Sequence, residues 1–222
     1  MRSGLMRNRF AAISALPCAW LFAASGAHAQ TLEESVLQRI NAIRANPAAY
    51  AEELQKYRGY FDGEIVYLPG DYNGILTREG VAVVDETIAF LEHQPALPPL
   101  APAQVLALTA ADYSHEQGER GARGHVGTDG SQPGDRVKRH GGGIFVGEAI
   151  AYGASDADDV VRQMIVDDGV PDRGHRKLLF DKKTRFAGIG CGPHASMDYI
   201  CVVDLSATPD GRAIRVRYAL QR

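Results

Sequence analysis

Three glycine-rich segments of this sequence contain a histidine or an acidic residue. They are RGHVGTDGS with His125, GEAIAYG with Glu148, and DDGVPDRGHR with Asp167 and His175. Neutral imidazoles are good ligands for Zn²⁺ or a similar divalent cation, and carboxylates can orient such ligands or accept a proton from a bound water. A site made of these residues would bind a metal at an open position, with hydrolysis as the further chemistry it would support.

Several other catalytic motifs are excluded by their spacing. SHEQGE begins like the helical zinc-protease motif, but the position four residues after His115, which needs a histidine, holds Glu119. DGSQPG lacks the spacing of a nucleophile elbow, and GGGIFVGE has neither the glycine spacing of a dinucleotide site nor a phosphate-binding lysine. The isolated histidines His115 and His194 are interpreted as solvent-exposed hydrogen-bonding residues.

The first thirty residues differ in character from the rest of the chain. Three arginines precede an apolar run that ends at the small residues around Ala29. This order predicts a signal peptide over residues 1–29 that is cleaved after Ala29, and therefore a secreted or periplasmic protein without a transmembrane anchor. A retained anchor is the alternative, but the run contains Pro17 and is short for a span of about 20 residues.

Length and charge narrow the remaining possibilities. The 222 residues, with 45% hydrophobic and 23% charged side chains, are typical of one globular domain. Cleavage would remove three arginines and no acid, which changes the formal charge from −3 to −6. Because nucleic-acid binding needs a basic field, nucleic acid is not expected as a partner.

Cleavage would leave Cys191 and Cys201 as the only cysteines. Both lie in strand-like runs and are equidistant from Ser196, so they would face each other in an antiparallel hairpin centred on that residue. Disulfides persist in exported proteins. We therefore predict a Cys191–Cys201 disulfide, with two buried free thiols as the alternative.

The apolar periodicity predicts helices first and strands mainly later. Helices are expected over residues 31–46, 47–57, 81–93, 103–120 and 155–168, and strands over 143–153 and on both sides of Ser196. Residues 58–78 show no sustained period and are expected to be irregular. A short turn is expected at HRKLLF, and residues 211–220 are expected to form an exposed or edge strand. This order indicates an α+β fold without βαβ repeats.

Taken together, the motifs resemble a known family. The chain contains NAIR at 41–44, AADYSH at 110–115, HVGTDGSQPGDR at 125–136, GEAIAYG at 147–153 and GHRKLL at 174–179, followed by GIGCG and CVVDLS. In this order they are similar to the CAP superfamily, the domain shared by cysteine-rich secretory proteins, antigen 5 and plant pathogenesis-related proteins, in its bacterial extracellular branch.

The resemblance implies a single-domain α-β-α sandwich over residues 30–222, with 55–97 as an insertion that small family members lack. It also implies a central cavity lined by two histidines and two acids: His125, Glu148, Asp167 and His175. Asp167 takes the place of a family glutamate, and Asp168 is the alternative if the register shifts by one. Asp172, Arg173 and Arg176 are expected in a solvated, charge-balanced loop.

Three functions are consistent with such a site. The first is a binding module that holds a divalent cation such as Zn²⁺ on His125 and His175 and has a groove for a lipid, peptide or glycan. The second is a metal-dependent hydrolase of the peptidase type. The third is an extracytoplasmic scaffold in which the four residues satisfy each other's hydrogen bonds. We favour binding over catalysis because the sequence offers no dedicated nucleophile and no third histidine ligand.

Overall fold

The computed structural model describes residues 30–214 of the chain. The predicted signal peptide and most of the predicted tail strand lie outside this range, and residues 211–214 do not form a strand. Within the range, no helix combines the length and the apolar character that crossing a bilayer requires.

The long helices begin where the sequence places their caps. Helix α1 (Leu32–Ala45) starts with a reciprocal capping box between Thr31 and Glu34. Helix α2 (Pro47–Arg58) follows directly, with Asn46 as its cap and proline in its first turn. Helices α3 (Val81–His93), α4 (Gln104–Arg120) and α6 (Ala157–Val166) also fall in predicted segments. Two shorter helices, α5 (Pro133–Arg139) and α7 (Gly174–Leu179), form where a loop and a turn were expected.

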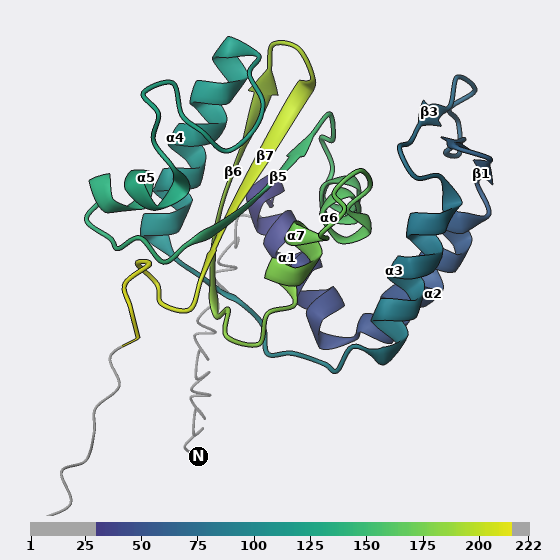
Figure 1. Cartoon of the computed structure of the whole chain (residues 1–222), viewed down its shortest axis with the longest axis horizontal. Helices are drawn as coiled ribbons and strands as arrows, with labels where there is room; N and C mark the ends of the chain where they lie inside the picture. Colours follow the sequence, from purple (N-terminus) through teal and green to yellow (C-terminus); the bar gives the residue numbers. More distant parts are fainter. Residues whose placement is uncertain (1–29, 215–222) are drawn as a thin grey trace, which may run out of the picture.

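A four-stranded mixed sheet forms the centre of the domain. Its strands are β4 (Ala101–Pro102), β6 (Phe186–His194), β7 (Asp198–Ser206) and β5 (Gly147–Tyr152), in that spatial order. The β4–β6 pair is parallel and the other two pairs are antiparallel. Helices α4 and α5 cover one face, and α1, α6 and α7 cover the other (Figure 1). The predicted α+β sandwich is therefore confirmed.

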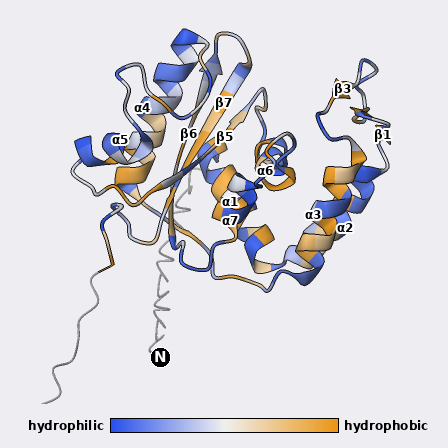
Figure 2. Cartoon of the chain, in the orientation of Figure 1, coloured by the Kyte–Doolittle hydropathy of each residue, from blue (hydrophilic) through white to orange (hydrophobic). Residues whose placement is uncertain are grey.

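Apolar side chains fill both interfaces between helices and sheet. In Figure 2 the hydrophobic colour follows the sheet strands and recurs along the helices. On the α1 and α6 side, Val36, Ile40 and Met164 pack in one cluster with Val203. On the α4 side, Tyr113 and neighbouring residues pack against alternate residues of β5 and β7. The period-2 alternation along the strands thus divides the core between the two faces.

The predicted hairpin and disulfide are confirmed. Strands β6 and β7 pair so that Cys191 lies opposite Cys201, with Cα atoms 4.1 Å apart and an S–S bond of 2.07 Å. Ser196 lies in the turn between the strands, as the equal spacing of the cysteines predicts. The disulfide therefore connects the two central strands of the sheet.

Removal of this disulfide should measurably weaken the domain. Replacing both cysteines with alanine should lower the free energy of unfolding by about 3 kcal/mol, because the crosslink limits the freedom of a short loop in the unfolded chain. Urea unfolding of the variant and of wild type, with and without reductant, would measure the effect. Equal midpoints for oxidised wild type and the variant would contradict the expectation.

Residues 58–78 are more ordered than predicted. They form a small antiparallel sheet of β1 (Phe61–Asp62), β2 (Ile65–Val66) and β3 (Ile75–Leu76) at the end of the α2–α3 helix pair. Each strand has only two residues, which is too short to give a readable alternation. Figure 1 shows α2, α3 and these strands as an arm at one side of the sandwich.

Candidate functional site

His125 lies in the loop between α4 and α5, next to the edge strand β5. Its Nδ1 lies 2.9 Å from Oε1 of Glu148, the second residue of β5. A carboxylate only accepts hydrogen bonds, so Nδ1 carries the proton and the lone pair of the neutral ring lies on Nε2. Glu148 thus orients the ring and leaves Nε2 free to bind a ligand.

Arg136 of α5 holds both members of this pair. Its Nη2 donates to Oε2 of Glu148 over 2.6 Å, and its Nη1 donates to the backbone carbonyls of His125 and Ser131, both over 3.0 Å. The guanidinium also lies 3.5 Å from the centre of the Tyr113 ring. No role is predicted for Arg136 from the sequence, although this residue ends the HVGTDGSQPGDR motif.

Two tyrosines hold the loop at the residue before His125. The hydroxyl of Tyr113 donates to the carbonyl of Gly124 over 2.8 Å, and the hydroxyl of Tyr152 accepts from the Gly124 amide over 2.9 Å. Burial raises the pKa of Tyr113 to about 12, so its hydroxyl stays protonated and able to donate at neutral pH. The position of His125 is therefore fixed by its loop as well as by its carboxylate partner.

The second histidine comes from the other side of the sheet. Asp167 ends α6 with a left-handed backbone (φ 61°), a conformation that aspartate tolerates better than most residues. Its Oδ2 accepts from the amides of His175 and Arg176 over 2.9 and 3.2 Å, at the start of α7. Its Oδ1 lies 2.8 Å from Nδ1 of His175, a close contact that is not aligned as a hydrogen bond. Asp167 therefore caps α7 and places its histidine.

The structure brings all four predicted residues together. The rings of His125 and His175 have centroids 6.3 Å apart with an interplanar angle of 54°. Their side chains are 45% and 20% exposed, whereas those of Glu148 and Asp167 are 1% and 0% exposed. The two histidine rings therefore lie near each other at the surface, and the Nδ1 atom of each lies next to a buried carboxylate.

Asp168, the alternative fourth residue, has a different role. Its carboxylate accepts from the amides of Arg78 and Glu79, both over 2.8 Å, and so connects the end of α6 to the segment before α3. It contributes to the attachment of the α2–α3 arm. Asp167 is the acid that contacts His175.

The prediction of a solvated loop is wrong for Arg173 and Arg176. Arg173 forms ion pairs with Glu79 and Glu86, and its hydrogen bonds hold the pKa of Glu79 down at about 2. Arg176 is buried and donates to Glu86 and to the Thr87 hydroxyl on α3. The acceptors lie between 87 and 94 residues away in the sequence, so the local balance of charges does not indicate them.

The two isolated histidines differ from each other. His115 is exposed, as predicted. His194 is buried, which contradicts the prediction, because its Nε2 donates to the carbonyl of Ala122 over 2.7 Å and its ring packs on Tyr152. It connects the β6–β7 hairpin to the end of α4.

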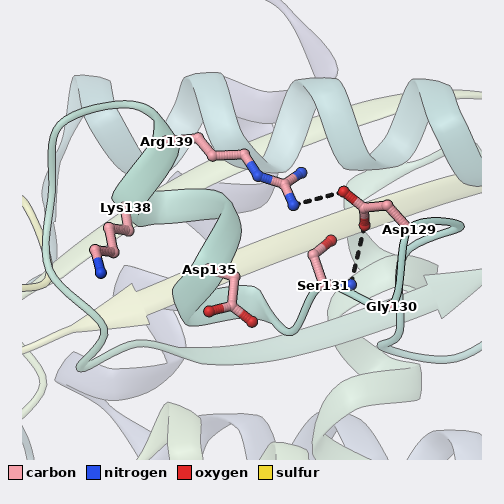
Figure 3. Close-up of a pocket in the computed structure, with 6 residues that line it drawn as sticks. All are labelled: Asp129, Gly130, Ser131, Asp135, Lys138 and Arg139. Atoms are coloured by element: carbon pink, nitrogen blue, oxygen red, sulfur yellow. Dashed lines mark hydrogen bonds and ion pairs between the residues drawn. The ribbon is translucent and has the colours of Figure 1, made fainter.

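Surface pockets lie elsewhere on the domain. One of about 480 Å³ lies on the loop that follows His125 and on α5, with Asp129 between the Ser131 amide and the Arg139 guanidinium (Figure 3). Hydrogen bonds from Ser131, and then from Arg139, lower the pKa of Asp129 to about 2. Another of about 650 Å³ lies between α1 and the start of α6. Neither pocket is lined by any of the four predicted site residues His125, Glu148, Asp167 and His175, called the tetrad below. The predicted central cavity therefore remains a prediction.

The metal-ligating capacity of these four residues is limited to the two histidines. Among residues 30–214, no group of three or more His, Cys, Asp or Glu side chains is placed to hold a metal ion. The donor set is therefore limited to the two Nε2 atoms. Glu148 accepts from Nδ1 of His125 and from Arg136, and Asp167 accepts from two backbone amides while its other oxygen lies against Nδ1 of His175. A cation on two protein ligands keeps open positions for water or an exogenous ligand.

Two bacterial proteins are among the solved structures similar to this chain. One is an extracellular protein containing a SCP domain from Bacillus anthracis str. Ames, with 26% sequence identity, a TM-score of 0.41 and coverage of 55% of this chain. The other is an outer surface protein from Borrelia burgdorferi, with 22% identity, a TM-score of 0.41 and coverage of 49% of this chain and 77% of its own. The match spans 38% of the Bacillus chain. A search of curated proteins finds no match.

The comparison with family models covers more of the chain than the comparison with solved structures. The model of the CAP, or cysteine-rich secretory protein, family matches residues 37–205. That range extends from α1 to the end of β7 and contains all four tetrad residues and the disulfide. This chain is therefore a member of the CAP family of cysteine-rich secretory proteins.

Proposed function

We propose that this protein is an exported binding protein that holds a divalent cation such as Zn²⁺ between His125 and His175. The observation that carries the proposal is the orientation of the rings. Each Nδ1 faces a buried carboxylate, 2.9 Å away in one case and 2.8 Å in the other, which leaves both Nε2 atoms for a ligand. Carboxylate support of this kind is a common way of preparing histidine for metal binding.

The separation of the rings is longer than a shared tetrahedral ion allows. With a Zn–N bond of about 2.1 Å, a ring radius of about 1.1 Å and tetrahedral angles, two rings on one ion have centroids about 5 Å apart. The observed 6.3 Å exceeds this by about 1 Å. We therefore expect the more exposed His125 ring to move toward His175 when an ion binds.

A separate apolar pocket supports the groove part of the proposal. It has a volume of about 430 Å³ and lies at the β4–β6 edge of the sheet, whereas the tetrad lies at the β5 edge. Its lining is mainly aliphatic, with acidic residues at the start of α1: Glu33, Glu34, Leu37, Pro102, Ala103, Gln104, Ala107, Ala187, Gly188 and Ile189. Such a lining favours a lipid chain or an apolar peptide over a glycan.

Export is supported by the sequence of residues 1–29 and by the disulfide, which persists in oxidising compartments. We expect the mature protein to begin at Gln30 and to be secreted or periplasmic. Mass spectrometry of the protein recovered from the medium or periplasm would identify this end.

Metal binding should raise the thermal midpoint of tag-free protein that has first been treated with a chelator. At a free Zn²⁺ concentration 100 times Kd, binding to the folded state alone contributes about 2.7 kcal/mol. The rise should grow with Zn²⁺ and disappear in His125→Ala and His175→Ala. His115→Ala, which removes an exposed histidine outside the site, is the matched control and should respond like wild type.

The same variants distinguish cation binding from the two alternative functions, a scaffold and a hydrolase. If the four residues form only a scaffold, Zn²⁺ will leave the wild-type midpoint unchanged. If the protein is a hydrolase, a peptide or ester will be turned over by wild type, and turnover will be lost in the two tetrad variants while His115→Ala keeps it. When bound, the cation would polarise a water or ligand at its open positions, which is the chemistry such a hydrolase would need.

A further inference from the structure

One further buried acid lies near the tetrad, on a central strand of the sheet. Asp204 lies on β7 and is 0% exposed. Within the part of the chain that the structure describes, neither of its carboxyl oxygens has a hydrogen-bond partner. The antiparallel register places Asp204 directly opposite Glu148 on β5, so the two side chains lie on the same face of the sheet.

The surroundings of Asp204 contain one other acid and one arginine. Glu148 faces it from β5, Arg136 comes from α5, and Tyr113 of α4 packs under the guanidinium. On its other side, β6 presents Gly188, which has no side chain. The one guanidinium is already committed to Glu148 and to two backbone carbonyls. An ionised Asp204 would therefore be a buried charge without a cation of its own, which is strongly unfavourable.

Protonation resolves this conflict. Two carboxylates only accept hydrogen bonds, so they cannot bond to each other unless one of them carries a proton. Burial, followed by the charge of Glu148, raises the pKa of Asp204 well above its usual range, and Arg136 opposes the shift. Oε1 and Oε2 of Glu148 each have one partner, His125 and Arg136, and a carboxylate oxygen can accept a second hydrogen bond.

We infer that Asp204 is a neutral carboxylic acid that donates its proton to Glu148 and so fixes the carboxylate that orients His125. Asp204 is thus a positioning residue that acts through Glu148. With Asp204 protonated, the charges next to His125 are one negative charge on Glu148 and one positive charge on Arg136. A second carboxylate there would favour the imidazolium form, in which Nε2 has no lone pair.

The effect of Asp204 on cation binding rests on the proposed function. The proton shared between Asp204 and Glu148 does not. The test therefore uses metal-free protein in the presence of a chelator. In the infrared spectrum of wild type at neutral pH, a carboxylic-acid carbonyl band should remain after the exposed carboxyls have ionised. This band should be absent from Asp204→Asn, which keeps the shape and a hydrogen-bond donor but cannot ionise.

The pH dependence of unfolding gives a second readout. A carboxyl with a raised folded pKa binds more protons in the folded state, so stability falls as pH rises from the ordinary aspartate pKa to the raised one. Within that window the ratio of folded to unfolded wild type should fall by up to about tenfold per pH unit relative to Asp204→Asn. Asp198→Asn, the same change at an exposed position of β7, is the control and should follow wild type.

NMR titration of His125 separates the two charge states. If Asp204 is neutral, Asp204→Asn removes no charge and the titration midpoint of His125 should stay unchanged. If Asp204 is ionised, the substitution removes a negative charge near His125, and the midpoint should fall by about one pH unit, a tenfold loss of proton affinity. A fall of this size, or the absence of the carbonyl band from wild type, would overturn the inference. Failure of Zn²⁺ binding alone would leave it standing.

Discussion

Gly190→Ala should remove much of the stability of this domain, whereas Gly192→Ala, two residues further along β6, should be tolerated. An added Cβ at Gly190 would overlap the backbone of Ala110 and Ala111 in α4, and neither the helix nor the central strand can move aside. We expect a loss of about 3 kcal/mol or more, at the upper end of overpacking costs. A Cβ at Gly192 would meet no atom within 4 Å.

Chemical unfolding of the two variants beside wild type measures this effect. Gly192→Ala should stay within about 1 kcal/mol of wild type, and it removes the same backbone freedom from the unfolded chain as Gly190→Ala. The difference between the two variants therefore isolates the contact with α4. Equal stabilities would show that α4 does not pack on β6 through these glycines.

The sequence predicts the parts of the fold that depend on local signals. The capping box at Thr31 and the Asn46-Pro47 pair mark helix starts, because caps satisfy backbone amides through residues only three positions away. The equal spacing of Cys191 and Cys201 from Ser196 predicts the hairpin register. The short helices α5 and α7 escape such signals because one or two turns give too few apolar positions to define a period.

The candidate site is predictable as a set of residues but not as a network. His125 and Glu148 belong to the α4 and α5 side of the sheet, while α7 with His175 packs over Gly147 on the opposite face. The two halves meet only because β5 is an edge strand. The spacing of His125 and His175, which are fifty positions apart, does not indicate that the two residues meet. Their proximity is predicted from the resemblance of the motif order to that of the family.

The supporting charges are the least predictable part of the site. A lone acid in the apolar run ICVVDLS was the available signal for Asp204, since an inward position of a central strand rarely carries a charge. For Arg136, the available signal in the sequence was its position at the end of a motif. The partners of both lie on other elements, so their roles follow from tertiary packing.

Arg176 joins the tetrad to the α2–α3 arm. It is 3% exposed and donates to the carbonyls of Ile165 and Val166 at the end of α6, to the Thr87 hydroxyl and to Glu86. Burial lowers the pKa of Arg176, and Glu86 acts in the opposite direction. The network therefore offsets the cost of burying the charge, and it also satisfies carbonyls that the end of a helix leaves unpaired.

Arg176→Met should therefore lower the free energy of unfolding by about 3 kcal/mol, because the methionine fills the space but leaves two helix-end carbonyls and a hydroxyl without a donor. The matched control is Arg58→Met. Arg58 on α2 pairs with Asp85 on α3, but both side chains are 47% exposed, so the loss should be much smaller than for Arg176→Met. Urea unfolding compares the two variants, and equal losses would show that Arg176 acts only as a surface ion pair.

The same substitution should also affect the response to Zn²⁺. Helix α6 ends at Asp167, which caps the helix that carries His175. Arg176→Met should therefore reduce any Zn²⁺-dependent rise in the thermal midpoint, whereas Arg58→Met should leave that rise intact.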